Sequence, residues 1–157
     1  MGGLKVRVFE TLESVLTHVG QEVAQSDWVQ ISQERIDGFA NATEDHQWIH
    51  TDPVRAFHGP FKTTIAHGFL TLSMIPTLFD QSIEFQWRSM GINYGLNKVR
   101  FTGTVPVDSR IRATFTLLSA IIVEEPRGLQ TTWHVELTRE GVDKPVCVAE
   151  SVLRHYV

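Results

Sequence analysis

A carboxylate and an imidazole stand five residues apart in this chain. Asp45 and His50 lie in the run NATEDHQWIHTDP, which extends from Asn41 to Pro53. Brought together by a bend, such a pair can divide the work of proton transfer, because each group shifts the other's pKa and fixes its orientation. The pair could therefore activate a water molecule. The alternative is that Asp45 caps a turn while His50 fills the loop, and spacing alone slightly favours that alternative.

Histidines are concentrated in this region, which raises the question of a metal site. Four of the seven fall within 22 positions, namely His46, His50, His58 and His67. On a helix His46 and His50 would share one face, with Asp45 as a third ligand. However, this stretch follows the expected end of a helix at Asn41, and Pro53 restricts the residue before it to extended geometry. We therefore predict no metal, and interpret His46 and His58 as solvated or hydrogen-bonded side chains.

Gly68 is expected where a buried apolar helix begins. Its backbone N–H would be one of the unpaired donors of the helix N-terminus, where the dipole favours negative charge. Without a side chain in the way, a substrate oxygen could approach that N–H and be stabilised as an oxyanion on a thioester carbonyl. Close helix packing is an equally good explanation for a glycine at this position.

Three helices are predicted in the first half of the chain. Apolar spacing indicates one within Phe9–Val19, and Ser32 is a good N-cap for a second, which ends at Asn41. The third, Ile65–Phe79, is apolar nearly all round and should form the buried centre of the domain. Pro76 should kink this helix or mark its last turns.

The second half of the chain shows the alternation of apolar and polar residues that is typical of strands. The short connections favour antiparallel pairing, because parallel strands need long crossovers. Helices followed by antiparallel strands indicate an α+β fold, and 157 residues suffice for one domain, residues 1–157, but not for two. The predicted strands are Val99–Val105, Arg110–Leu118, Leu129–Leu137 and Val146–Leu153.

Composition narrows the partners and the compartment. A net charge of −4 and a pI near 5.9 give no global basic surface, so nucleic acid is not expected as a partner. Cys147 is the single cysteine and fits a reducing compartment. No segment approaches the roughly 20 apolar residues of a membrane span, and the N-terminus lacks a signal pattern. We therefore predict a cytoplasmic protein that does not bind membranes.

Three runs of residues carry a family resemblance: ATEDHQWIHTDP, GPFKTTIAHGFLTLSMIP and INYGLNKVRFTGTVPVDSRIR. Together they resemble the MaoC-like dehydratases, which are (R)-specific enoyl-CoA hydratases of the hot-dog fold, and in particular the nodulation protein N-like branch. The resemblance implies a curved antiparallel sheet wrapped around a long central helix. It also implies a homodimer with substrate tunnels at the shared interface.

The same resemblance implies a reaction. Asp45 and His50 would act on a water that adds to the double bond of a trans-2-enoyl thioester, giving an (R)-3-hydroxyacyl product. His50 would be the base and Asp45 the proton donor, while the N–H of Gly68 polarises the thioester carbonyl. A coenzyme A thioester would be the substrate, and neither a metal nor a redox cofactor would be needed.

Further candidates come from the resemblance, together with departures from the family pattern. Gln47, His67 and Asn97 are candidates for substrate contacts, and Lys98 and Arg100 for the phosphates of coenzyme A. Gln47-Trp48 replaces the commoner Asn-Pro, so Gln47 could take over the role of that asparagine. A helix serine found in some relatives is Pro76 here; Ser73 is a possible substitute, although it more readily bonds to the helix backbone.

Two other functions stay open. A hot-dog thioesterase would use a carboxylate to attack or activate water at the carbonyl itself, and the histidine five residues after Asp45 argues against it. A non-catalytic module that binds acyl thioesters is the second alternative, and the missing helix serine leaves room for it.

Overall fold

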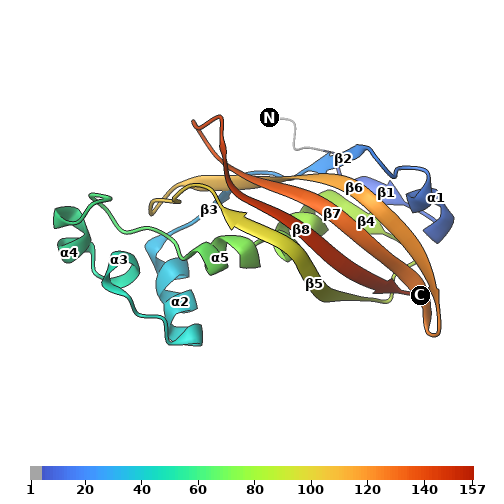
Figure 1. Cartoon of the computed structure of the whole chain (residues 1–157), viewed down its shortest axis with the longest axis horizontal. Helices are drawn as coiled ribbons and strands as arrows, with labels where there is room; N and C mark the ends of the chain where they lie inside the picture. The colour runs from blue at the N-terminus through green and yellow to red at the C-terminus, as the bar shows by residue number, and fades with distance from the viewer. Residues whose placement is uncertain (1–4) are drawn as a thin grey trace.

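A curved antiparallel sheet dominates the computed structural model, which describes residues 5–157 (Figure 1). Met1–Leu4, part of the N-terminal segment predicted to lack a signal pattern, lie outside the described residues. The main strand order is β2-β6-β7-β8-β5, and β3 also pairs with β6. These strands are β2 (Glu22–Gln25), β3 (Val29–Gln30), β5 (Met90–Phe101), β6 (Arg110–Glu124), β7 (Arg127–Arg139) and β8 (Pro145–Tyr156).

The central strands confirm the predicted alternation. In β6 the side chains of Ile111, Ala113, Phe115 and Leu117 are fully buried, and the residues between them are only partly so. The strand predicted at Val99–Val105 was misplaced, since β5 begins at Met90 and ends at Phe101. Apolar residues do recur at every second position from Met90 to Leu96, but because β5 is an edge strand with nearly every residue exposed, this alternation does not mark a buried face.

The first two helices differ from expectation in length. Helix α1 covers only Leu12–Leu16, because Phe9 belongs to strand β1 (Arg7–Phe9), which pairs in parallel with β4 (Ile83–Phe85). Helix α2 (Gln33–Thr43) begins as predicted at Ser32, whose side chain accepts a hydrogen bond from the N–H of Arg35. A cap of this kind stabilises a helix by about 1 kcal/mol. Two short helices, α3 (Trp48–Thr51) and α4 (Pro53–His58), were not predicted.

The central helix is divided in two. Helix α5 covers Gly68–Ser73 and α6 covers Ile75–Ser82, with Met74 between them. Pro76 therefore lies in the first turn of α6, rather than in the last turns of one long helix, because proline lacks the N–H that would continue the hydrogen-bond ladder. Burial is also incomplete: Phe69 is 67% exposed.

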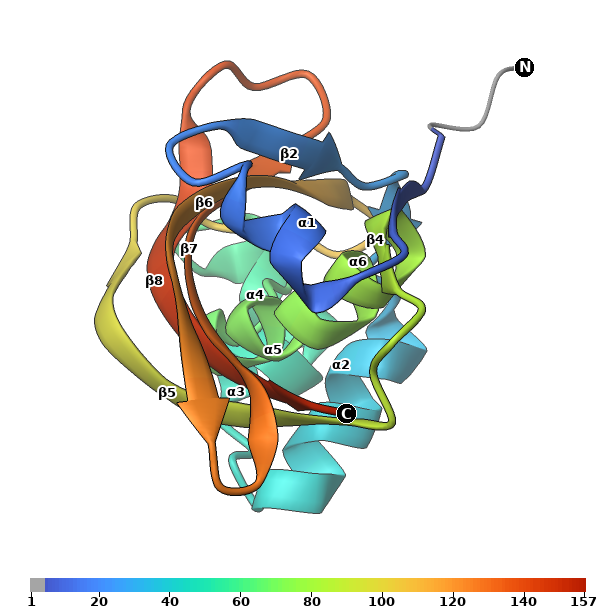
Figure 2. The ribbon, with the colours of Figure 1, turned by 90° about the vertical axis from the view of Figure 1, so that its right-hand side faces the viewer.

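The sheet wraps around α5 and α6, as predicted (Figure 2). Phe79 on α6 packs edge-on against Phe115 and Trp133 of the sheet, with ring centroids 5.3 and 5.2 Å apart. Helices α2, α3 and α4 lie together beyond one end of the sheet, next to the start of α5 (Figure 1). Within residues 5–157, no helix has the length and apolar character needed to span a membrane.

Candidate active site

Asp45 and His50 are brought together by a bend between α2 and α3. Helix α2 ends at Thr43 and is followed by its C-cap Glu44, whose φ of 62° places it in the left-handed region; three further non-helical residues lead to α3. Asp45 lies exposed in this bend, whereas His50, in the last turn of α3, is buried. The bend that the paired side chains required is therefore present.

One nitrogen of His50 is fixed by the backbone. Nδ1 lies 2.7 Å from the carbonyl oxygen of Ile65. A carbonyl can only accept, so Nδ1 carries the proton and the neutral ring keeps its lone pair on Nε2. Burial lowers the pKa of His50 below 6.5, and His67 lowers it further, outweighing the opposing effects of the Ile65 bond and Asp45. His50 is therefore suited to be a base at neutral pH.

His67 lies behind the pair. Its Nε2 donates to the backbone carbonyl of Asp45 at 2.9 Å, and its ring stacks on that of His50 with centroids 3.8 Å apart and planes 26° apart. Its ring is also 4.9 Å from that of Phe39, on α2. His67 thus contacts both members of the pair.

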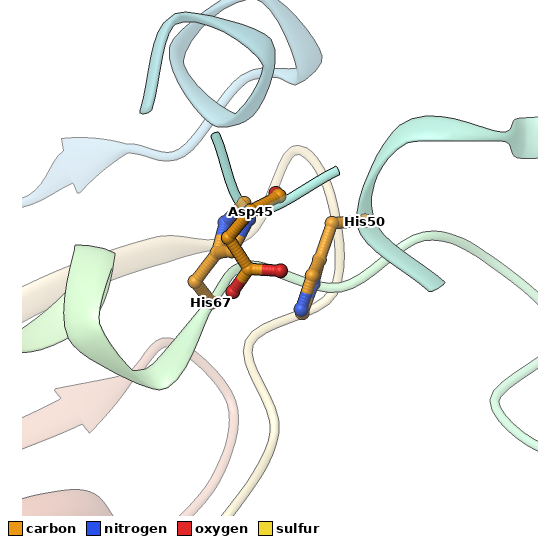
Figure 3. Close-up of side chains that lie close together, drawn as sticks. All are labelled: Asp45, His50 and His67. Carbon is orange, nitrogen blue, oxygen red and sulfur yellow. The ribbon is translucent and has the colours of Figure 1, made fainter. Parts of the chain in front are cut away.

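The three side chains form a compact cluster (Figure 3). One donor atom each from Asp45, His50 and His67 lie within 4.8 Å of one another. A shared metal would need the lone pairs of both rings to converge on it. Lone pairs lie in the ring planes, so two rings stacked at 26° direct them nearly side by side, which suits a common metal poorly. The geometry fits acid–base chemistry better.

A cavity of about 350 Å³ opens beside the cluster. His50 and Gly68 both line it, which places the candidate base and the candidate oxyanion donor around one space. Asp45 and His67 are not among its lining residues. The other walls come from the start of α5, the end of β5 and the loop that follows, including Ala66, Thr71, Phe101, Thr102 and Val105.

Gly68 was expected either to donate its N–H to a substrate oxygen or to allow close helix packing, and the structure has features of both. It is the first residue of α5 and lines the cavity. The ring of Phe101 also packs directly against it, so closely that a Cβ on Gly68 would lie 2.9 Å from Cδ2 of that ring. Close packing and access to the N–H are therefore both present at this glycine.

The structure does not bring the candidates on β5 to the cavity. Lys98 and Arg100 line a separate hollow with His134 and Glu150. Val99, between them, packs against the core, so Lys98 and Arg100 project from the opposite face of the sheet. Their contact with coenzyme A phosphates stays a prediction without support from the cavity. Asn97 is exposed at a register irregularity between its neighbours.

Gln47 and Ser73 are also placed. Gln47 is exposed at the N-cap of α3 without capping it through its side chain. Ser73 donates to the carbonyl of Phe69 at 2.6 Å, which confirms that it bonds to the helix backbone. It lines a different hollow, with Leu72 and Leu96, rather than the one at His50.

Two supports for His50 could not be foreseen from residue types or spacing. The side chain of Gln33, on α2, donates to the carbonyl of His50 at 2.8 Å and accepts from the hydroxyl of Thr64 at 2.6 Å. Gln33 thus ties α2 and α3 to the segment before α5. The carbonyl of Ile65 fixes the imidazole itself. No residue type reveals a backbone acceptor, and a glutamine 17 positions away is indistinguishable from any other polar helix residue.

Known proteins resemble this chain over most of its length. Residues 14–138 match the model of the MaoC like domain family. The chain is 49% identical to 3-hydroxyacyl-thioester dehydratase Z of Mycobacterium tuberculosis over 153 residues, covering 96% of this chain and 99% of that protein. It is 41% identical to nodulation protein N of Rhizobium leguminosarum bv. viciae over 141 residues, covering 88% of this chain and 87% of that protein.

Among solved structures, the (R)-hydratase of A. caviae involved in PHA biosynthesis superposes with a TM-score of 0.68 at 24% identity, covering 86% of this chain and 94% of that one. This likeness confirms the hot-dog fold. The family match covers most of the chain, and both relatives align over nearly their whole lengths. The chain belongs to the MaoC-like dehydratase domain family.

Proposed function

We propose that this protein catalyses the reversible hydration of trans-2-enoyl thioesters to 3-hydroxyacyl thioesters. One observation carries the proposal: the Ile65 carbonyl holds the proton of His50 on Nδ1, leaving Nε2 basic on a side chain that shares a cavity with Gly68. The name of the 49%-identical relative, a 3-hydroxyacyl-thioester dehydratase, supports the same reaction in reverse.

In the hydration direction, His50 Nε2 takes a proton from a water in the cavity as its oxygen bonds to the β-carbon. The electron pair of the double bond moves toward the carbonyl, giving an enolate-like thioester. Asp45 delivers a proton to the α-carbon. The proton that His50 took from water then passes to Asp45, which began the reaction protonated, so the pair ends as it began.

The N–H of Gly68 stabilises the negative charge that develops on the thioester oxygen. Removing one such donor typically costs about 10²–10³ in kcat in enzymes that stabilise an oxyanion. Proton transfer and this donor account for the chemistry, so the proposed reaction needs neither a metal nor a redox cofactor.

We further propose that the substrate is an enoyl-CoA and the product the (R)-isomer. Solved structures with this fold include (R)-hydratases, which favours that stereochemistry. His50 lines one wall of the cavity, so a substrate held there in one orientation would receive water on one face of the double bond. Chiral analysis of the product tests this directly, and comparison of enoyl-CoA with the same enoyl group on an acyl carrier protein tests the carrier.

A homodimer through β5 completes the proposal. This strand is the outer member of the main sheet, and its free edge would accept the same strand of a second copy. Large apolar side chains are exposed along it and on neighbouring α5, which a partner would cover. They are Phe69, Met90, Ile92, Tyr94, Leu96 and Phe101.

The experiment is a hydration assay with crotonyl-CoA, read as loss of the enoyl absorbance. Asp45→Asn and His50→Gln should each lower the rate by at least about 10²-fold, while His58→Gln, an exposed histidine outside the cluster, should not. Release of free thiol without hydration would indicate the thioesterase instead. Binding without either reaction would indicate the non-catalytic module. Unchanged rates in both variants would disprove the site.

A further inference from the structure

His67 contacts both members of the proposed catalytic pair but does not line the cavity. Its side chain is 2% exposed, and the lining of the cavity includes its neighbours Ala66 and Gly68 but not His67 itself. A side chain enclosed in this way cannot bind a substrate that occupies the cavity. The prediction that His67 contacts the substrate therefore lacks support from the structure.

The hydrogen bond to Asp45 acts on the backbone, not on the carboxylate. Asp45 lies in a non-helical bend outside the helix hydrogen bonding that fixes the ends of α2 and α3. Nε2 of His67 donates to its carbonyl at 2.9 Å, which holds the bend at the residue that carries the proton donor. Because a carbonyl only accepts, this bond fixes the tautomer of His67 as well.

The ring of His67 contacts two other rings. The ring of Phe39, from α2, lies 4.9 Å from it and is tilted by 52°, and the ring of His50, from α3, stacks on it at 3.8 Å. The Ile65 carbonyl fixes one edge of the His50 ring, and the face of His67 limits rotation about that bond. Two independent contacts of one side chain thus locate the two reacting groups.

We propose that His67 is a positioning residue that sets Asp45 and His50 relative to each other, through its hydrogen bond to the Asp45 backbone and its stacking on the His50 ring. This role rests on the proposed function, since the pair must be the acid–base pair for its placement to matter. Misplacement of reacting groups by about 1 Å can cost about 10²-fold in rate even when binding is unaffected.

A second effect of His67 is electrostatic. Its positive charge, when present, lowers the pKa of His50, while Asp45 raises it. On α2, the side chain of Asp37 faces the amide of Gln33 that bonds to the His50 carbonyl. Replacing His67 by an uncharged residue leaves these acidic groups in place and removes the charge that opposes them. The pKa of His50 should therefore rise.

Two substitutions separate the contacts. His67→Phe keeps an aromatic ring against His50 but loses the donor, whereas His67→Gln keeps a donor near the position of Nε2 but loses the ring. Each should lower kcat for crotonyl-CoA by about 10- to 100-fold with KM changed by less than about threefold. Each should also move the acidic limb of the kcat/KM profile to higher pH. His58→Phe is the matched control and should change neither quantity.

The outcomes distinguish this role from its alternatives. A rise in KM with kcat unchanged would show that His67 binds substrate, and wild-type kcat together with a wild-type pH profile in both variants would overturn the proposal. Loss of turnover in Asp45→Asn with full turnover in the His67 variants would reject positioning while the proposed function stands. An inactive wild-type protein would reject the function itself.

Two measurements by NMR do not depend on turnover, and the first needs no variant. In the wild-type protein the imidazole ¹⁵N signals should show the proton of neutral His67 on Nε2 and that of neutral His50 on Nδ1. The pKa of His50, followed through its ring signals, should be higher in a folded His67 variant than in the wild type. A proton on Nδ1 of neutral His67, or an unchanged pKa of His50, would contradict the proposal.

Discussion

The ring of Phe101, at the end of β5, lies against the backbone of Gly68, at the start of α5. A Cβ on Gly68 would approach the ring to 2.9 Å, a separation that side chains essentially never show. This contact joins the edge strand to the central helix next to His50. It also means that any test of Gly68 as an oxyanion donor must separate catalysis from packing.

Gly68→Ala should destabilise the fold by about 1–3 kcal/mol, because the added methyl overpacks against Phe101. In the double variant Gly68→Ala with Phe101→Ala, the clash is removed. The loss of stability in the double variant, measured by urea denaturation, should therefore be smaller than the sum of the losses in the two single variants. If kcat stays low in the double variant compared with Phe101→Ala alone, the methyl group blocks access to the N–H. Purely additive losses of stability would mean that the two residues do not clash.

The acidic limb of the kcat/KM profile should lie below pH 6.5. His50 must be unprotonated to act as a base, and burial lowers its pKa, so the active form persists to lower pH than for an exposed histidine. The profile for crotonyl-CoA measures this directly. A limb above pH 6.5 would mean that another group controls the rate or that His50 is not the base.

Acid should destabilise the protein through His155. Burial, and to a lesser extent the charge of Arg88, lowers the pKa of this side chain to about 3 in the folded state. The unfolded chain takes up the proton near pH 6.5, so its contribution to stability is fully present above that pH and is lost as pH falls toward 3. At 1.36 kcal/mol for each pKa unit, the full loss is on the order of 5 kcal/mol.

His155→Phe provides the comparison, because it keeps a ring in the core and removes the titration. The free energy of unfolding of the wild type should fall more steeply between pH 6.5 and 4 than that of the variant, by urea denaturation at each pH. Parallel curves would show that His155 does not titrate in this way.

The proposed dimer gives a fourth prediction. Wild-type protein should have about twice the 17.8 kDa mass of one chain by light scattering. Leu96→Lys places a charge on the edge strand β5, where it would be buried by a partner, and should yield monomers. Ile121→Lys makes the same change at an exposed site on β6 and should leave the dimer intact. A monomeric wild-type protein would show that β5 does not form a dimer interface.

Local sequence patterns predicted much of the fold. The N-cap at Ser32, the alternation in β6 and the buried apolar stretch after Gly68 depend on contacts within a few residues, and all three are present. The start of β5 was missed, although apolar residues recur at every second position from Met90 to Leu96, because the glycines and asparagines between them are typical of turns. The short helices α3 and α4 are packed around Trp48 and Gly59 rather than specified by apolar spacing.

The sequence by itself determined which groups are available for chemistry: a carboxylate and an imidazole five residues apart, and a glycine at a helix start. Only the tertiary structure decided how they are used. Packing of α2, α3 and α5 places the Ile65 carbonyl on His50 and places His67 behind the pair. It also turns Lys98 and Arg100 to the face opposite the core, because neighbouring strand residues alternate sides. These relationships join residues far apart in the chain, and no local spacing encodes them.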